Sequence, residues 1–196
     1  MGLTENGKRA ILLYINKGER KMAENKLHLY TGDGKGKTTA AFGLALRALG
    51  HKRRVLIAQF LKSGTSGEIE GARAFENAYV VTVPATEKFT YQMTEEELKI
   101  EKQRQRDVLY MLIDKIDEMQ PETVILDELA VCAGIGLVPE EDMWKLIDKA
   151  LSCAETVVTG RYAPESLLER ADYVSEIVKK RHPFDKGIQA RKGVEW

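Results

Sequence analysis

Nine consecutive residues near the start of the chain have the composition of a loop that binds a phosphate chain. Their glycines allow backbone N–H groups to converge on anionic oxygens, and the helix expected to follow adds positive potential at its N-terminus. Lys37 is expected to contact a phosphate, and Thr38 to offer its hydroxyl oxygen to Mg²⁺. The nine residues are Thr31, Gly32, Asp33, Gly34, Lys35, Gly36, Lys37, Thr38 and Thr39.

The loop departs from the usual pattern G-x-x-x-x-G-K-[ST] at one position. Thr31 stands where the first glycine is usual, although Gly32 and Gly34 keep the loop rich in glycine. The alternative interpretation is a glycine-rich turn whose lysines have no function. The setting favours a phosphate loop, because a predicted strand ends directly before it and a predicted helix begins directly after it. The sequence therefore predicts a binding site for ATP.

Two adjacent acids and one arginine follow other predicted strands, Asp127 and Glu128 after one strand and Arg161 after another. Ligands of open α/β sheets bind at the carboxyl ends of the strands, so these side chains are expected near the phosphate loop. Alone, the acid pair would be an ordinary turn or helix cap. Beside a phosphate loop, either acid could hold a metal ion together with Thr38, and the spacing leaves open which one touches it. Arg161 could contact a phosphate or a ribose, or lie on the surface.

Short β-branched runs alternate along the chain with longer stretches of helical character. This alternation predicts an α/β fold with a mostly parallel sheet of about six strands and helices on both faces. The runs are nearly continuous in apolar residues, as expected of strands covered on both faces. The predicted strands are Leu27–Tyr30, Val55–Phe60, Tyr79–Val83, Thr123–Leu126, Thr156–Thr159 and Tyr173–Val178. The predicted helices span residues 37–49, 68–76, 94–119, 140–152 and 164–170.

The predicted helix 94–119 has the clearest local signals. Thr94 and Glu97 form a T-x-x-E capping box, and Pro121 follows the end of the helix. The first half, EEELKIEKQRQRD, is expected to face solvent. An apolar stripe in the second half is expected to face the core, and it consists of Leu109, Leu112, Ile113 and Ile116.

Length and composition predict one main domain after a short extension. The chain has 196 residues, of which 43% are hydrophobic, and 30 Lys and Arg balance 30 Asp and Glu. Residues 1–25 are expected to form an N-terminal helical extension that packs across a partner subunit or frays, and residues 26–196 the main domain. The charge balance argues against a protein that binds nucleic acid.

Other features predict a cytoplasmic protein. No stretch reaches the roughly 18 apolar residues of a membrane span, and the N-terminus lacks the apolar segment of a signal peptide. Cys132 and Cys153 are too few for a disulfide framework and are expected to be reduced packing residues. His28 is expected to be partnered in the core or at a dimer contact. The loop Leu61–Gly67 either closes over a substrate or is a plain connection.

Several segments together resemble the bacterial ATP:corrinoid adenosyltransferases, which adenosylate cob(I)alamin or cob(I)yrinic acid a,c-diamide. They are TGDGKGKTTAAFGLALRALGH, VILDEL, VVTGR, ADYVSEI, the Phe-Thr-Tyr loop at residues 89–91 and the ending RHPFDKGIQARKGVEW. The resemblance runs from about Leu27 to Trp196 and rests on the order of these segments in one chain. It implies a transferase with a RecA-like P-loop core that forms homodimers and binds ATP, Mg²⁺ or Mn²⁺, and a corrinoid.

The resemblance also implies how the reaction proceeds. ATP lies reversed in the loop, so that its 5′-carbon faces the attacking cobalt(I), and triphosphate is released. Phe89 and Tyr91 match the aromatic pair that displaces the lower axial ligand of cobalt, although many members carry Trp in place of Tyr91. The expected catalytic residues are thus Lys37, Phe89 and Tyr91. His182 either approaches the ligands or anchors the tail. A flavodoxin or another flavoprotein would supply the electron.

Two other functions stay open from the residues alone. A conventional P-loop kinase or ATPase would release ADP instead of triphosphate. A non-catalytic protein that delivers or senses the nucleotide or corrinoid would bind ATP without turnover. The identity of the natural corrinoid, of the reductant and of the preferred metal is not encoded in these motifs.

Overall fold

A computed structural model describes residues 25–62, 66–83 and 90–195 of the chain. The predicted N-terminal extension, apart from Asn25, lies outside these residues. The elements in chain order are β1 (Leu27–Thr31), α2 (Lys37–Gly50), β2 (Val55–Phe60), α3 (Gly67–Arg73), β3 (Ala78–Val83), η1 (Thr90–Gln92), α4 (Glu95–Met119), β4 (Thr123–Asp127), α5 (Leu129–Gly134), α6 (Glu140–Leu151), β5 (Glu155–Thr159), α7 (Glu165–Arg170), β6 (Tyr173–Glu176) and η2 (Pro183–Lys186).

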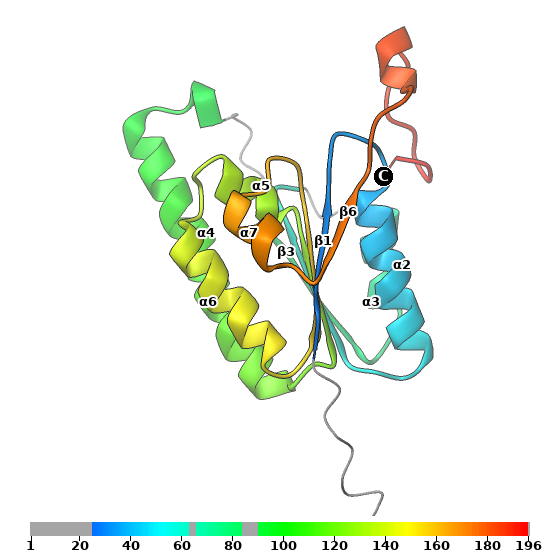
Figure 1. The fold of residues 1–196 in the computed structure, drawn as a ribbon, viewed down its shortest axis with the longest axis vertical. Coiled ribbons are helices and arrows are strands. Elements are labelled where there is room, and N and C mark those ends of the chain that lie inside the picture. Colours follow the sequence, from blue (N-terminus) through cyan, green and yellow to red (C-terminus); the bar gives the residue numbers. More distant parts are fainter. Residues whose placement is uncertain (1–24, 63–65, 84–89, 196) are drawn as a thin grey trace, which may run out of the picture.

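The strands form one six-stranded sheet in the order β3-β2-β4-β5-β1-β6. Every pair of neighbouring strands is parallel, which confirms the predicted α/β fold. Figure 1 shows α2 and α3 on one face of the sheet and α4, α5, α6 and α7 on the other. All strands therefore end at the same edge of the sheet, where the loops that follow them meet.

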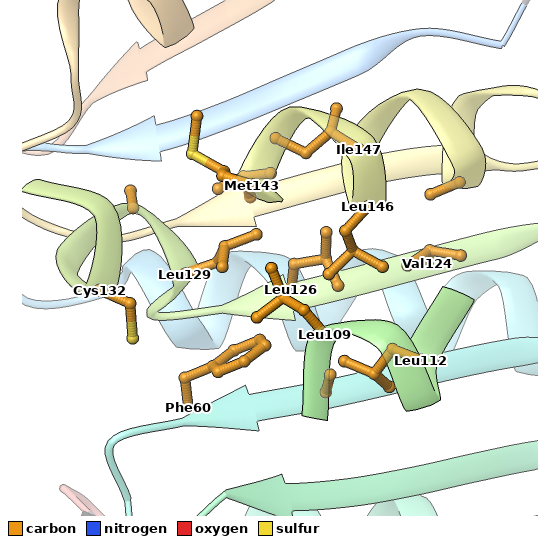
Figure 2. Close-up of a cluster of buried hydrophobic side chains, with 14 of the residues drawn as sticks. Phe60, Leu109, Leu112, Val124, Leu126, Leu129, Cys132, Met143, Leu146 and Ile147 are labelled. Atoms are coloured by element: carbon orange, nitrogen blue, oxygen red, sulfur yellow. The ribbon is translucent and has the colours of Figure 1, made fainter. Parts of the chain in front are cut away.

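The core has one layer on each face of the sheet, and strand β2 contributes to both. Leu56, Ala58 and Phe60 belong to the cluster beneath α4, α5 and α6, whereas Val55 and Ile57 belong to the cluster beneath α2 and α3. This division follows from the alternation of side chains along a strand. Figure 2 shows the larger cluster, in which the side chain of Cys132 is buried as a packing residue.

The two edge strands differ from the prediction of strands covered on both faces. All four residues of β6 are exposed, and most of β3 is only half-buried, because each has a neighbouring strand on one side only. Strand β6 also ends at Glu176, before the predicted Val178. The next residue turns toward the phosphate loop, where the Ile177 carbonyl accepts a hydrogen bond of 2.6 Å from the Gly34 N–H.

Helix α4 confirms the predicted capping box and corrects the prediction of a solvated first half. The Thr94 hydroxyl accepts from the Glu97 N–H, and the Glu97 carboxylate accepts from the Thr94 N–H. Glu101 and Gln105, however, are buried, because they continue the buried stripe toward the N-terminus of the helix at a spacing of four residues. The Gln105 amide donates a hydrogen bond of 2.7 Å to the Glu101 carboxylate. The buried stripe consists of Glu101, Gln105, Leu109, Leu112 and Ile116, with Ile113 half-buried beside it.

One short helix was missed by the prediction, and one predicted histidine contact is confirmed. The sequence did not predict helix α5, because its six residues are too few for a clear helical period. His28 is partnered: its Nε2 lies 2.7 Å from Glu155 Oε1, and its ring stacks on Tyr173. Within the described ranges, no helix combines the length and the apolar character that a membrane crossing requires.

Candidate active site

The predicted phosphate loop connects the end of β1 to the start of α2. Gly32 and Gly36 adopt positive φ angles of 93° and 125°, which a residue with a side chain rarely adopts. Gly34 lies so close to Ile177 that a β-carbon there would be 2.6 Å from its carbonyl oxygen. The cap residue Gly36 has no side chain to occupy the first N–H groups of α2, so these donors face the end of the loop. The loop therefore has the form of an anion site.

Lys37, the first residue of α2, folds its ammonium back over the loop. It is 7% exposed, and its Nζ donates hydrogen bonds of 2.8 Å and 2.9 Å to the carbonyl oxygens of Gly32 and Gly34. Burial lowers the pKa of Lys37 below its ordinary value, and the positive charge of Arg161 lowers it further. The loop thus holds a buried cation at its centre, where a phosphate oxygen would be attracted.

Asp127, at the end of β4, is completely buried and accepts four hydrogen bonds. Its Oδ1 accepts from the hydroxyls of Thr38 and Thr159, at 2.9 Å and 2.7 Å. Its Oδ2 accepts from the amide of Gln59 at 3.0 Å and from the ammonium of Lys62 at 2.9 Å. Strands β2 and β5, helix α2 and the residue Lys62 after β2 supply these donors, so the carboxylate fastens the start of α2 to the sheet edge.

Glu128 differs from its neighbour in both conformation and surroundings. It adopts a left-handed backbone conformation with φ of 64°, uncommon for a residue other than glycine, and its N–H donates to the hydroxyl of Thr159. This turn directs its side chain into the cleft, where it is 21% exposed. Burial and the adjacent charge of Asp127 raise the pKa of Glu128 above its ordinary value. Of the two acids, Glu128 is therefore the one whose carboxylate faces the cleft.

Lys62 is the functional candidate that the sequence analysis missed. It follows β2 and reaches the acid pair, with its Nζ 2.8 Å from Thr38 Oγ1 and 3.8 Å from Glu128 Oε1. Its position directly after a predicted strand, at the edge where ligands bind, could have indicated a role in the site. Lys62 lies in the loop Leu61–Gly67, which the sequence predicted either to close over a substrate or to be a plain connection.

These residues line a cleft of about 600 Å³ beside the phosphate loop. It contains the N-terminal end of α2, the positively charged side chains of Lys35, Lys37, Lys62 and Arg161, and the carboxylates of Glu68, Glu128 and Glu195. The structure therefore brings together most of the residues predicted from sequence. The full lining is Gly34, Lys35, Gly36, Lys37, Thr38, Thr39, Phe42, Lys62, Gly67, Glu68, Glu128, Arg161, His182, Gly193, Val194 and Glu195.

Three predicted loop residues face another way. Thr31, Gly32 and Asp33 line a second pocket behind the loop, which Arg161 also borders. The Asp33 carboxylate accepts a hydrogen bond of 2.9 Å from the Lys179 N–H, and this bond lowers the pKa of Asp33. Asp33 thus holds the C-terminal segment in this structure, and a role in nucleotide binding stays a prediction.

Comparison with known proteins places the chain in a family. The family model described as "ATP:corrinoid adenosyltransferase BtuR/CobO/CobP" matches residues 23–196. The chain is 34% identical to the corrinoid adenosyltransferase of Escherichia coli (strain K12), over 86% of this chain and 84% of that protein. It is 33% identical to the corrinoid adenosyltransferase CobA of Salmonella typhimurium, over 86% of this chain and 84% of that protein.

The chain belongs to the ATP:corrinoid adenosyltransferase family. A similar match to the corrinoid adenosyltransferase of Pseudomonas aeruginosa, 33% identical over 87% of this chain and 83% of that protein, agrees with this assignment. The match includes the whole described sheet, the cleft and the C-terminal segment, so the resemblance predicted from short motifs is confirmed over nearly the full chain.

The C-terminal segment of this family member closes one side of the cleft. Figure 1 shows it returning from β6 to the N-terminal end of α2. The Lys35 ammonium donates hydrogen bonds of 3.1 Å to the Val194 carbonyl and to the Glu195 carboxylate. His182 lines the cleft, and its Nδ1 accepts from the Phe184 N–H. His182 therefore lies at the edge of the cleft, and its approach to a ligand stays a prediction.

The donor set at the acid pair fits a Mg²⁺ or Mn²⁺ ion. Mg²⁺ prefers oxygen ligands and is usually held by one or two carboxylates together with phosphates and water. The hydroxyl of Thr38 and the carboxylate of Glu128 are oxygens of this kind, and both line the cleft. Among the described residues, no group of three or more His, Cys, Asp or Glu side chains forms a metal site of its own. The protein donors thus suit a metal ion that arrives with a polyphosphate.

The predicted aromatic pair is the part of the site on which the structure bears least. Phe89 lies outside the described residues. Tyr91 belongs to the short helix η1, which ends two residues before the capping residue Thr94 of α4. The role of both residues against the lower face of a corrinoid stays a prediction.

Proposed function

We propose that this protein transfers the 5′-deoxyadenosyl group of ATP to the cobalt(I) ion of a corrinoid and releases triphosphate. Family membership over residues 23–196 is the observation that carries the proposal. The cleft supports it independently, because a phosphate loop, a buried lysine and a presented carboxylate converge there. In this reaction the Co–C bond forms as the bond between C5′ and oxygen breaks, and the electron pair of that bond leaves with triphosphate.

The residues of the cleft have chemistry that suits this leaving group. Lys37 and the first N–H groups of α2 provide fixed positive charge for the oxygens of the triphosphate as negative charge develops on them. Arg161 borders the loop, where its Nη2 donates a hydrogen bond of 3.2 Å to the Asp33 carbonyl, and it can bind a further phosphate oxygen. The attacking atom belongs to the corrinoid, so the protein needs to supply no side-chain nucleophile.

Asp127 and Glu128 have different roles in this proposal, one orienting a hydroxyl and the other binding a metal ion. Thr38 and Glu128 would hold a Mg²⁺ or Mn²⁺ ion, which supplies charge stabilisation to the phosphates when bound. Asp127 has both oxygens engaged by four protein donors and is completely buried, so it orients the Thr38 hydroxyl instead of touching the metal. The sequence left open which acid touches the metal, and the burial of Asp127 and the exposure of Glu128 to the cleft support Glu128.

Further expectations belong to the same proposal and stay predictions. They are a homodimer, a flavodoxin or other flavoprotein as the reductant, a cytoplasmic location, and an aromatic lid made by Phe89 and Tyr91 over the lower face of the corrinoid. Light scattering of the purified protein tests the first, and reduction of a bound corrinoid by candidate flavoproteins tests the second.

The experiment that tests the function is an anaerobic incubation with ATP, Mg²⁺ and chemically prepared cob(I)alamin. The proposal predicts the absorption spectrum of a Co–C bond and an equal amount of intact triphosphate. Release of ADP and phosphate without a Co–C bond would favour a conventional ATPase. Tight ATP binding with no reaction would favour a delivery or sensor protein.

Two lysine variants make this experiment specific to the cleft. Lys37→Met removes the buried ammonium and is expected to lower the rate by about 10²–10³-fold, the usual loss for one fixed donor to a developing anion. Lys102→Met removes the same charge from the exposed surface of α4 and is expected to react at the wild-type rate. Equal losses in both variants would contradict the assignment of Lys37.

A further inference from the structure

The Lys62 ammonium lies beside the two oxygens proposed to hold a metal ion, those of Thr38 and Glu128, and beside the buried carboxylate of Asp127. Its Nζ is 2.9 Å from Asp127 Oδ2, 2.8 Å from Thr38 Oγ1 and 3.8 Å from Glu128 Oε1. One positive charge therefore lies in contact with a hydroxyl and beside two carboxylates. Such an arrangement balances part of the negative charge of an acid pair when no other cation is bound.

The Thr38 hydroxyl makes this ammonium a direct competitor of a metal ion. The hydroxyl has one hydrogen, which it donates to Asp127 Oδ1, so its oxygen is left to accept. The donor it accepts from is Lys62. A metal ion also binds through this oxygen, so the ammonium and the metal compete for the electron pairs that point into the cleft.

The backbone brings Lys62 to this position by an uncommon turn. Leu61 adopts a left-handed conformation with φ of 56°, which non-glycine residues adopt rarely. Leu61 directly follows the last residue of β2, and its side chain packs against the larger core cluster. This packing holds the turn in place. Backbone conformations of this kind persist where the surrounding structure enforces them, and they gather at functional sites.

The Lys62 ammonium can also reach other partners in the cleft. The side chain is 31% exposed, and Lys62 lines the same cleft as Lys37 and Arg161, the residues proposed to bind the polyphosphate. A lysine has a flexible stem and a compact charge, so its ammonium can move without a change in the backbone. A phosphate chain in the cleft would offer it new oxygen partners.

We propose that Lys62 is the counter-ion of the acid pair in the nucleotide-free protein, and that it passes to the polyphosphate when a divalent cation and ATP bind together. This inference rests on the proposed function for the identity of the nucleotide. It makes Lys62 a residue that suppresses binding of metal alone and favours binding of the metal–nucleotide pair. The protein then takes up its metal with its substrate.

Binding of Mn²⁺ to the full chain without nucleotide tests the first half, with free Mn²⁺ measured by electron paramagnetic resonance. If the ammonium occupies the site nine-tenths of the time, its removal raises the affinity about tenfold. Lys62→Met is therefore expected to bind Mn²⁺ about tenfold more tightly than wild type, and the surface control Lys102→Met equally to wild type. An unchanged or weaker affinity in Lys62→Met would overturn the proposal, because a merely structural ion pair would give that result.

Calorimetry with inorganic triphosphate, at a Mn²⁺ concentration that saturates both proteins, tests the transfer of the ammonium to the polyphosphate. Lys62→Met is expected to bind triphosphate about tenfold more weakly than wild type, as expected for loss of one charge-assisted hydrogen bond. An affinity equal to that of wild type would overturn the transfer of the ammonium to the polyphosphate. Lys62→Gln, which keeps a polar side chain, is measured alongside as a second variant in case Lys62→Met does not fold. It is expected to change the Mn²⁺ and triphosphate affinities in the same directions as Lys62→Met.

The failure of this inference and that of the proposed function are distinguishable. A protein that forms no Co–C bond would refute the function, yet its Mn²⁺ affinity would still respond to Lys62→Met if the counter-ion inference holds. An active adenosyltransferase with unchanged Mn²⁺ affinity in the variant would refute the inference alone.

Discussion

The two adjacent acids are expected to respond oppositely to loss of their charge. Asp127→Asn replaces one carboxylate oxygen by an NH₂ group in a completely buried position. If that group takes the place of Oδ2, it faces the donors of Gln59 and Lys62. If it takes the place of Oδ1, it faces the hydroxyls of Thr38 and Thr159, whose oxygens already accept other hydrogen bonds. In either orientation, two of the four hydrogen bonds are lost or strained.

The size of the effect follows from this geometry. A buried donor left without an acceptor costs about 1–3 kcal/mol, so two mismatched donors lower the free energy of unfolding by about 3 kcal/mol after partial relaxation. In a chain of this length, each kcal/mol lost from the free energy of unfolding lowers the midpoint of thermal unfolding by about 2–4 °C. The midpoint of Asp127→Asn is therefore expected to fall by about 6–12 °C.

Glu128→Gln is the matched comparison. Burial and the charge of Asp127 raise the pKa of Glu128, so its charged form is less stable in the folded protein than in the unfolded chain. The sign follows directly: above that raised pKa the charge opposes folding, and its removal leaves the free energy of unfolding at pH 7 equal or higher. The same substitution is expected to abolish the metal-dependent adenosyl transfer.

Urea denaturation of the metal-free, nucleotide-free proteins measures both effects on one scale. The free energy of unfolding is expected to fall for Asp127→Asn and not for Glu128→Gln. A loss in Glu128→Gln as large as that in Asp127→Asn would refute the division between an orienting acid and a presented acid.

Three further predictions concern other parts of the molecule. Gly34→Ala is expected to weaken ATP binding and to lower the free energy of unfolding by about 1–3 kcal/mol, because its β-carbon would lie 2.6 Å from a backbone oxygen of the C-terminal segment; Gly43→Ala, which meets no atom within 4 Å, is expected to stabilise helix α2 in the same urea experiment. Substitution of Phe89 or Tyr91 by Ala is expected to impair reaction with cob(II)alamin and a mild reductant while sparing reaction with prereduced cob(I)alamin, and equal losses in both assays would contradict the axial-ligand role. The Cys132 thiol, whose pKa burial raises, is expected to resist a thiol reagent at pH 8 until the protein unfolds, as followed by peptide mass spectrometry.

Much of the fold could be predicted because its signals are local. The strand Val55–Phe60 has the predicted bounds, and the capping box of α4 forms from two residues only three positions apart. The phosphate loop could likewise be predicted, since strand, glycines, lysine and helix are contiguous. These features depend on residues that are neighbours in sequence, which is what periodicity and motif spacing describe.

What escaped prediction depends on contacts between distant parts of the chain. Glu101 and Gln105 have the composition of a solvated surface, yet helix packing buries them, and the Gln105 amide donates a hydrogen bond to the Glu101 carboxylate. Lys62 lies 65 positions from Asp127 in sequence, and its contact with that acid exists only because β2 and β4 are neighbours in the sheet. The closure of the cleft by the C-terminal segment likewise joins Lys35 to Glu195. No local pattern specifies such pairings.

The central claim is that bound ATP reacts at its 5′-carbon and that the triphosphate departs intact from the phosphate loop. ATP labelled with ¹⁸O in the bridge between C5′ and the α-phosphorus tests it, in an anaerobic single turnover with prereduced cob(I)alamin and mass spectrometry of the products. The whole label is expected in the triphosphate and none in the nucleoside. Label that stays with a nucleoside or with ADP, with phosphate released, would contradict it.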